Sequence, residues 1–379
     1  MNTDIFDMTT NLPPQVPDIF EPVYIRAMQT ILNRGNLAAR FGTHAFNGNE
    51  DDRVAGASFV SRRLETVPEP GRMVITNSTQ AALLATITRI VGVGGTLAVD
   101  QATYPAIGQF ASLFQFHLIP LPIDREGTDP DAFSRACERY KPDALYATPT
   151  LQNPTTGVMG LKRRRAITET ARRHSVTIIE DDIYSLLPVN QPPPLAALAP
   201  EITWYILGTT KGIAAGLKTC YVVAPSKKAA EQTFWPGVRA TYWMCAPANA
   251  SLVTELIKED RIDRIISAVR TETRNRQDRV ARALSGITFR AHQEGLHVWV
   301  PLPPDIPGPM FVAELQKLGI KVAPGELYAV GNATPLNGIR FGTGKPETVD
   351  DLDVRVQQIR AVFSRLVNPI RVHRSGGRQ

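Results

Sequence analysis

Cysteine is scarce in this sequence of 379 residues, which contains only Cys137, Cys220 and Cys245. An odd number of widely spaced cysteines predicts neither a disulfide framework nor a thiolate metal site, and it is typical of proteins in the reducing cytoplasm. The 6 histidines show no ligand spacing either. We therefore expect a cytoplasmic protein that binds no metal ion.

Long apolar runs and strong charge are also missing. No run approaches the roughly 18 apolar residues of a membrane span, and the N-terminal sequence MNTDIFDMTTNLPPQ has no apolar signal-peptide core. The net charge is +6, which is mild for this length. The densest basic cluster, residues 162–165, precedes Ile167 and Ala171 in a helical pattern, so a solvated helix face explains it better than a nucleic-acid site. We expect neither a membrane nor a nucleic acid as a partner.

From residue 73 onward, apolar strand-like segments alternate with amphipathic helical segments. The expected strands are residues 73–76, 96–99, 116–119, 144–148, 176–179, 205–207 and 220–223, and helices fit from residue 78 onward and at 106–113, 131–140 and 161–174. Such alternation indicates crossover connections between parallel strands. We expect an α/β fold with three layers, in which helices cover both faces of a mostly parallel sheet.

The two ends of the chain have a different character. Prolines at 13, 14, 17 and 22 are expected to prevent a long helix before Tyr24. Residues 35–51 are rich in glycine and asparagine and are expected to form an ordered loop, followed by a helix at 53–65. After Pro225 the chain is mostly helical over residues 249–284, and short strands and helices follow up to an amphipathic last helix.

This pattern predicts a second, smaller α+β domain. We expect residues 1–50 to form an N-terminal arm and a segment of the small domain, and residues 51–245 to form the large domain. A linking helix and the C-terminal small domain are expected at 246–379.

Two groups with complementary chemistry follow strands of the predicted sheet. Asp181 comes just after residues 176–179, and Lys211 comes just after residues 204–207. Residues beyond the carboxyl ends of parallel strands line the ligand crevice, so both side chains can face one ligand. Pyridoxal phosphate needs such a pair, because a lysine forms its Schiff base and a carboxylate keeps its pyridine nitrogen protonated. Each residue alone is also common in loops.

Ser78, Thr79 and Gln80 stand at a predicted junction of strand and helix. Free backbone N–H groups and the helix dipole make such a junction an anion site, and a plain N-cap is the alternative explanation. Lys218 offers a further cation for a phosphate, and the hydroxyls of Thr209 and Thr210 can complete the cup.

Four more residues suit a flat aromatic cofactor and its substrate. The ring of Tyr104, after residues 96–99, can stack on a pyridine ring, although packing is the alternative. Asn153 and Tyr184 can both hydrogen-bond a phenolic oxygen, although Asn-Pro with a nearby Gly also suits a simple turn. Arg340, on a strand-like segment, suits the capture of a substrate carboxylate by its planar fork.

Seven stretches carry a resemblance to a known family: TNSTQAALLA, DQATYPAIG, TPTLQNPTTGVMGLKRRRAI, TIIEDDIYSLL, GTTKGIAAGLKTCYVVAP, GLHVWVPLP and NGIRFGTGKP. They span about residues 76–346, and the N-terminal NLPPQ is similar to the start of the same domain. The sequence resembles fold-type I pyridoxal-phosphate enzymes of the class I and II aminotransferases. It is most similar to the aminotransferase-like domain that is fused to winged-helix regulators of the MocR type in the GntR family.

The resemblance implies a role for each candidate residue. Lys211 is implied as the internal aldimine and as the proton shuttle between Cα and C4′ of the cofactor. Asp181 is implied to pair with the pyridine nitrogen, Asn153 and Tyr184 with the phenolate oxygen, and Tyr104 to stack on the ring. The implied phosphate ligands are Ser78, Thr79, Gln80, Thr210 and Lys218, with Arg340 on the substrate carboxylate. A homodimer that completes the site is also implied.

The sequence departs from the family pattern at five positions. Thr210 stands in place of Ser, Lys218 in place of Arg, and both Cys220 and Ser78 in place of Gly. Phe41 stands where an aromatic hydroxyl often reaches the phosphate of the partner subunit. The ammonium of lysine is a point charge, whereas the guanidinium of arginine donates two parallel hydrogen bonds. We therefore expect the phosphate to be held less rigidly.

The expected function is an aminotransferase that moves an amino group between an amino acid and a 2-oxo acid, both small molecules. Alternatives are a lyase or cyclase of secondary metabolism that uses pyridoxal phosphate, and a sensor that binds the cofactor without turnover. A regulator is disfavoured because few residues precede NLPPQ, which leaves no room there for a winged helix.

Overall fold

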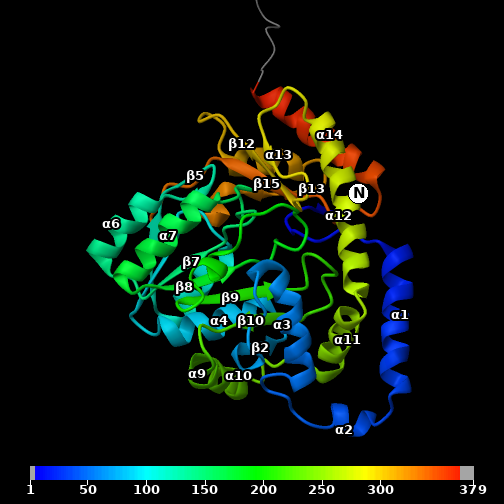
Figure 1. The fold of residues 1–379 in the computed structure, drawn as a ribbon. Helices are drawn as coiled ribbons and strands as arrows, with labels where there is room; N and C mark the ends of the chain where they lie inside the picture. The colour runs from blue at the N-terminus through cyan, green and yellow to red at the C-terminus, as the bar shows by residue number, and fades with distance from the viewer. Residues whose placement is uncertain (1–4, 368–379) are drawn as a thin grey trace, which may run out of the picture.

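A seven-stranded sheet forms the centre of the computed structural model, which describes residues 5–367 (Figure 1). Its strands, in spatial order, are β2 (Met73–Thr76), β10 (Cys220–Val223), β9 (Thr203–Gly208), β8 (Thr177–Asp181), β7 (Ala144–Ala147), β3 (Thr96–Asp100) and β4 (His117–Leu121). The strands from β9 to β4 pair in parallel, whereas β10 runs antiparallel to both β2 and β9. The predicted α/β fold with a mostly parallel sheet is confirmed.

Helices cover both faces of this sheet because its strands bury side chains on both sides. The helices α6 (Pro130–Tyr140), α7 (Leu161–His174) and α3 (Glu50–Leu64) lie on one face, and α4 (Thr79–Ile90), α5 (Pro105–Phe114) and α10 (Trp235–Thr241) lie on the other. Successive residues alternate between the two cores: Leu145 packs under α6 and α7, and Tyr146 packs on the side of α4 and α5. This alternation with period two is what buried parallel strands require.

A smaller antiparallel sheet lies at one end of the molecule (Figure 1). It is formed by strands that follow the long helix α12 (Arg261–Ala283) in the chain. Its strands are β11 (Arg290–Ala291), β12 (His297–Pro301), β15 (Gly338–Gly342) and β14 (Ala323–Pro324), and α13 (Gly308–Gln316) and α14 (Val349–Val367) pack with it. The N-terminal β1 (Phe6–Asp7) joins this part through a parallel pair with β13 (Ile320–Lys321). The predicted division at residues 50 and 245 stays a prediction, and its residues 1–4 and 368–379 lie outside the described range.

The expectation for the N-terminal prolines is wrong. The helix α1 (Pro17–Asn33) begins well before Tyr24, and Pro22 lies inside it. Pro17 occupies the first helical position, where a missing N–H costs nothing because that group has no intrahelical acceptor. The expected loop at 35–51 also contains a short helix, α2 (Leu37–Phe41), and α3 begins at Glu50.

A helical segment after Pro225 was not expected. It consists of α9 (Lys227–Ala229), a π-helical turn (Ala230–Phe234) and α10. Within it, Phe234 and Val238 are fully buried against the α4 side of the sheet. The expected helix at 249–284 is two helices, α11 (Pro247–Lys258) and α12, because Asp260 adopts a left-handed conformation between them.

The basic cluster at 162–165 is only partly a solvated face. Lys162 and Arg165 are exposed, and Arg163 pairs with Asp124 at 2.6 Å. Arg164, however, is fully buried, and its guanidinium donates to the carbonyls of Pro149, Met159 and Pro193. This arginine therefore fixes the backbone after β7, which the sequence pattern did not reveal.

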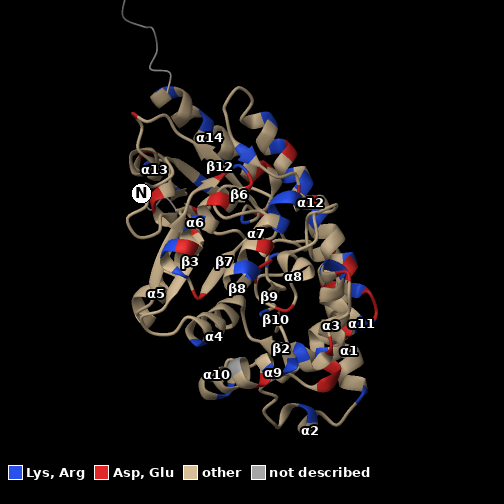
Figure 2. Ribbon diagram, turned by 60° about the vertical axis from the view of Figure 1, so that its left-hand side comes forward, with Lys and Arg blue, Asp and Glu red and all other residues tan. Residues whose placement is uncertain are grey.

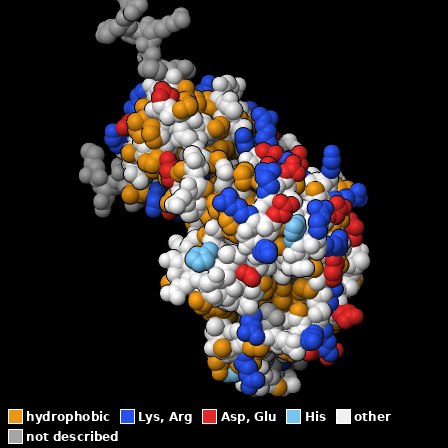
Figure 3. Space-filling view, turned by 90° about the vertical axis from the view of Figure 1, so that its left-hand side faces the viewer, with side chains coloured by type: hydrophobic (Ala, Val, Ile, Leu, Met, Phe, Trp, Pro, Cys, Tyr) orange, Lys and Arg blue, Asp and Glu red, His pale blue; other side chains and the backbone are white. Residues whose placement is uncertain are grey.

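Charges of both signs are spread over the outside of the molecule. Figure 2 shows Lys and Arg interspersed with Asp and Glu along the helices, including α12, and Figure 3 shows the same mixture on the face that it draws. Among residues 5–367, no helix is both long enough and apolar enough to cross a bilayer.

Candidate active site

One cavity of about 350 Å³ lies at the carboxyl end of the parallel strands. The residues predicted for the site that line it are Ser78, Thr79, Gln80, Tyr104, Asn153, Asp181, Tyr184, Thr210, Lys211, Lys218 and Arg340. All of them except Arg340 come together because the strands β2, β3, β7, β8 and β9 all end at the same edge of the sheet. Asp181 and Lys211 therefore face the same space, as the two strand ends predicted.

Asp181 is the last residue of β8, and its buried side chain lines the cavity. Its Oδ2 accepts a hydrogen bond of 2.9 Å from the hydroxyl of Tyr146, whereas its Oδ1 is buried and has no partner among the described residues. Burial raises the pKa of Asp181 to about 6, against the opposing effect of the Tyr146 hydrogen bond. Because an unpaired buried carboxylate oxygen is costly, this atom is placed to accept a hydrogen from a ligand.

Tyr146 is a site residue that the sequence analysis missed. It lies on β7 and is fully buried, and its side chain lines the cavity together with that of Thr148. The signal was available, because residues 146 and 148 share one face of the strand expected at 144–148, and Asn153 follows that strand in the sequence.

Lys211 follows β9 and lines the cavity. Its Nζ donates to the backbone carbonyl of Asn11 at 2.5 Å. Burial, aided by the charge of Arg340, lowers the pKa of Lys211 to about 8, and Asp181 acts in the opposite direction. A lysine with so low a pKa is partly neutral near pH 7 and can act as a nucleophile or a base.

Tyr184 lies in the turn after β8, and its hydroxyl oxygen accepts a hydrogen bond of 2.8 Å from the side-chain amide of Asn11. Burial raises the pKa of Tyr184 well above its ordinary value, so the hydroxyl remains protonated and can donate. His297 of β12 packs against its ring, with 5.5 Å between the ring centroids.

Arg340 brings the small sheet into the cavity. From β15, its guanidinium donates to Oδ1 of Asn153 at 3.0 Å and to the backbone carbonyl of Thr9, and it lies over the ring of Tyr328. Its Nε is buried without a partner in the part of the chain that the structure describes. The planar fork is thus oriented and still has a free donor for an anionic ligand.

The start of α4 forms the end of the cavity that is suited to bind an anion. Ser78 is the N-cap and accepts from the backbone N–H of Ala81 at 3.1 Å, so the simple cap considered above is present. The N–H groups of Thr79 and Gln80 have no intrahelical acceptor, as in the first turn of any helix, and Lys218 lines the same cavity. The cap and an anion site are therefore compatible here.

Thr209 lies elsewhere than predicted. It is fully buried, and its hydroxyl donates to the backbone carbonyls of Leu217 and Thr219, the latter at 3.0 Å. The side chain thus closes the turn that carries Lys211 and does not line the cavity.

The N-terminal residues 9–12 line the cavity as well, and the sequence analysis gave them no role. Their backbone passes so close to Gly342 and Gly344 that a Cβ there would lie 2.1 Å from the carbonyl oxygen of Thr10 and 1.9 Å from that of Leu12. Glycine at both positions therefore allows this segment to reach the site.

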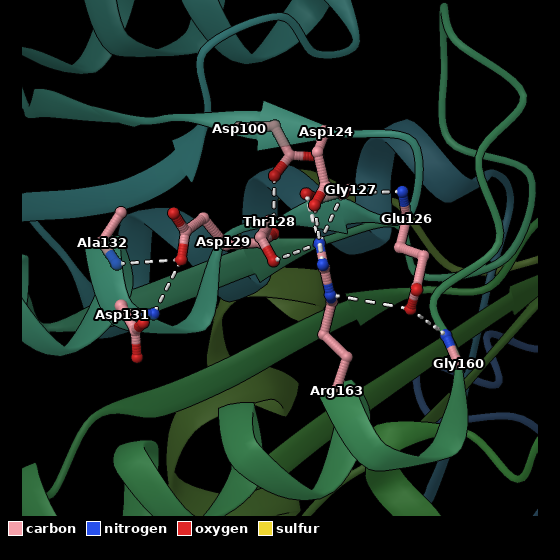
Figure 4. Close-up of polar contacts among 10 residues, drawn as sticks. All are labelled: Asp100, Asp124, Glu126, Gly127, Thr128, Asp129, Asp131, Ala132, Gly160 and Arg163. Atoms are coloured by element: carbon pink, nitrogen blue, oxygen red, sulfur yellow. Dashed lines mark hydrogen bonds and ion pairs between the residues drawn. The ribbon is translucent and has the colours of Figure 1, made fainter.

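Asp100, at the end of β3, stabilises the loop that carries Asn153. Oδ1 of this carboxylate accepts from the hydroxyl of Thr128 at 2.6 Å, as Figure 4 shows, and its Oδ2 accepts from Nε2 of Gln152 at 3.2 Å. Burial raises the pKa of Asp100 to about 6. The hairpin around Thr128 is in turn fixed by Arg163, so these contacts connect α7 to the loop beside the cavity (Figure 4).

The chain matches one protein family, described as aminotransferase class I and II, over residues 5–352. It is 28% identical over 297 residues to the uncharacterized HTH-type transcriptional regulator YdeF of Bacillus subtilis, covering 78% of this chain and 63% of YdeF. It is 22% identical over 342 residues to aromatic-amino-acid aminotransferase 1 of Thermococcus litoralis, covering 86% of this chain and 80% of that protein. The chain thus spans less than two thirds of the length of YdeF.

Solved structures show the same fold. The α-aminoadipate aminotransferase LysN of Thermus thermophilus, determined with N-(5′-phosphopyridoxyl)-L-leucine, superposes with a TM-score of 0.84 at 22% sequence identity. The match covers 97% of this chain and 94% of LysN. The expected fold-type I architecture is confirmed by this similarity.

Proposed function

The chain belongs to the family of class I and II aminotransferases, and we propose that it is a pyridoxal-phosphate-dependent aminotransferase. It would move an amino group between an amino acid and a 2-oxo acid. The observation that carries this proposal is the placement of Lys211, with its lowered pKa, and of Asp181, with its unpaired oxygen, in one cavity.

The residues of the cavity fit pyridoxal phosphate. The unpaired Oδ1 of Asp181 suits the protonated ring nitrogen, and the start of α4 with Lys218 suits the phosphate. When bound, the cofactor supplies an aldehyde that condenses with amines and a ring that withdraws electrons. Tyr104, whose hydroxyl accepts from Gln80 at 2.9 Å, is oriented to stack on the ring.

The side chains of this protein would then divide the work. Lys211 would attach the cofactor and would take up and return the proton of the substrate Cα. Asp181 holds the ring nitrogen protonated. Asn153 and Tyr184 hydrogen-bond the phenolic oxygen, and Arg340 binds the substrate carboxylate.

We propose that the protein acts as a homodimer in the cytoplasm. A partly exposed aromatic group formed by His44, Phe46 and Tyr242 has ring centroids 5.2–5.4 Å apart. It adjoins the phosphate end of the cavity, because the N–H of Asn77 donates to the carbonyl of Trp243 at 3.0 Å. A second copy that covers these rings would bury apolar surface beside the site.

A sensor that binds the cofactor without turnover is the second candidate, because YdeF is described as a transcriptional regulator. The loaded protein should be mixed with a panel of amino acids while its visible absorbance is followed. An aminotransferase loses this absorbance with release of one 2-oxo acid per site, and recovers it when a 2-oxo acid is added. A sensor shows no release of 2-oxo acid, and that result would reject the proposed activity.

Replacement of Arg340 by alanine is expected to raise the Michaelis constant for amino acids on the order of tenfold to a hundredfold. The reason is the loss of charge-assisted hydrogen bonds to the carboxylate. Steady-state kinetics with an amino acid and with a simple alkylamine separate carboxylate binding from a structural role of Arg340. The alkylamine has no carboxylate, so its Michaelis constant should not change. An equal effect on both substrates would assign Arg340 a structural role.

Capture of pyridoxal phosphate by the cofactor-free protein is expected to accelerate as the pH rises toward about 8 and then to level off, because the neutral form of Lys211 reacts and its pKa is about 8. Rapid-mixing absorbance between pH 6 and pH 10 measures this profile. Since the Arg340 charge helps to lower this pKa, Arg340→Ala should move the midpoint upward and Arg340→Lys should leave it in place. A wild-type midpoint near the ordinary value of 10.5 would contradict the burial argument.

A further inference from the structure

An N-terminal strap, residues 8–12, crosses from the small sheet to the turn after β8. It is anchored on the small sheet by its backbone, since the N–H of Gly342 donates to the carbonyl of Met8 at 2.8 Å. The close approach to Gly342 and Gly344 leaves no space for the strap to shift toward the sheet. A side chain on this strap is therefore presented to the cavity at a fixed position.

Asn11 is the strap residue that touches the reacting groups. Its side chain is 3% exposed and donates from Nδ2 to the Tyr184 hydroxyl at 2.8 Å, while its backbone carbonyl accepts from Lys211. The two residues that it contacts follow strands β8 and β9 of the large sheet, 173 and 200 positions away in the sequence. Nothing in the assignment of roles above uses this amide.

The direction of the hydrogen bond follows from the cost of burial. In the observed orientation the atom left without a partner among the described residues is the acceptor Oδ1. If the amide were reversed, its NH₂ group would be buried with unpaired donors instead. Buried unpaired donors are rarer in proteins than under-satisfied carbonyl oxygens. The amide of Asn11 therefore donates, and the hydrogen of Tyr184 is left free.

We propose that Asn11 is a positioning residue that directs the Tyr184 hydroxyl hydrogen toward the cofactor oxygen. This inference rests on the proposed function, in which Tyr184 bonds the phenolic oxygen of pyridoxal phosphate. With an acceptor site of Tyr184 occupied by Asn11, the hydroxyl acts on the cofactor as a donor. A phenol that accepts one hydrogen bond also donates a stronger one.

The surroundings of Tyr184 allow this effect to be isolated. The groups that face its hydroxyl are Arg340 on β15, Asp181 on β8 and Tyr328, which lies between β14 and β15. The neutral ring of His297 on β12 packs against the ring of Tyr184. Substitution of Asn11 leaves all four in place.

The test is the pH midpoint of the visible absorbance of the protein loaded with pyridoxal phosphate. In Asn11→Ala, Tyr184 donates a weaker hydrogen bond to the phenolic oxygen of the cofactor and stabilises the deprotonated form of the Schiff base with Lys211 less. The midpoint should therefore rise by about half a pH unit to one unit. In a Tyr184→Phe background, the same substitution should cause no further shift, because the hydroxyl on which it acts is gone. The cycle of four proteins measures the coupling directly.

An unchanged or lowered midpoint in Asn11→Ala, or an equal shift in the Tyr184→Phe background, would overturn the proposal. If the alanine variant does not fold, Asn11→Asp keeps the size of the side chain and lacks the donor. In the Tyr184 background this carboxylate accepts the hydroxyl hydrogen and turns it away from the cofactor, so the midpoint should rise beyond the shift that the charge alone causes in the Tyr184→Phe background. Failure of the proposed function is seen separately, as a wild-type protein that develops no visible absorbance with the cofactor.

Discussion

Lys211→Ala is expected to remove the absorbance band of the Schiff base between Lys211 and pyridoxal phosphate. The same substitution should reduce turnover by about 10²–10⁴-fold. The amine of Lys211 lies in the cavity with Asp181 and has a pKa of about 8, so it is suited both to attach the cofactor and to move a proton. Alanine has no amine and can neither attach the cofactor nor move the proton. Absorbance spectra before and after borohydride reduction, together with single-turnover kinetics, measure the two losses.

Lys218→Ala is the matched control, because Lys218 also lines the cavity but is exposed. Its role in the proposal is to hold phosphate, so this variant should bind the cofactor more weakly and keep the visible absorbance at saturation. Visible absorbance that persists in Lys211→Ala and disappears in Lys218→Ala would reverse the assignment of the two lysines.

The position of the site was predictable because parallel strands place their carboxyl ends at one edge. Asp181, Lys211 and Asn153 each follow an apolar run in the sequence, and each run is a strand of the same sheet. The strands β7, β8 and β9 pair as neighbours, so the three residues had to meet once the sheet formed.

The parts that were missed depend on contacts between distant residues. No local pattern indicates that Asn11 donates to a tyrosine 173 positions away. Arg164 stands in a basic run typical of a solvated face, yet it is buried because three backbone carbonyls of neighbouring loops surround it. Sequence periodicity reports which side of an element is apolar, and it does not report a polar side chain that satisfies loop carbonyls.

The error at α1 has a local cause. Proline disfavours the interior of a helix, but Pro17 is the first helical residue and Pro22 remains within the helix. Burial of Val23, Ala27 and Ile31 against the core stabilises this helix, and such tertiary packing outweighs an unfavourable residue near the helix start.

Asp181→Asn is expected to reduce turnover by about 10²–10³-fold while the cofactor still binds. Asparagine has nearly the same shape, and its carbonyl can still accept from Tyr146, so the geometry of the site is preserved. What is lost is the negative charge that stabilises a protonated ring nitrogen. Without that proton the ring withdraws electrons less well from the substrate Cα. Kinetics at saturating cofactor, with the cofactor affinity measured separately, isolate the effect.

The neighbouring carboxylate provides the control for this charge. Asp182 is fully buried, but it pairs with Arg63 at 3.2 Å and accepts from Tyr205 at 2.9 Å outside the cavity. Asp182→Asn should therefore lower the melting temperature and leave the turnover of the folded protein near that of the wild type. A cofactor analogue in which carbon replaces the ring nitrogen should slow the wild type and leave Asp181→Asn with no further loss. If Asp181→Asn turns over like the wild type, the carboxylate does not act on the ring nitrogen, and its unpaired oxygen must serve another donor.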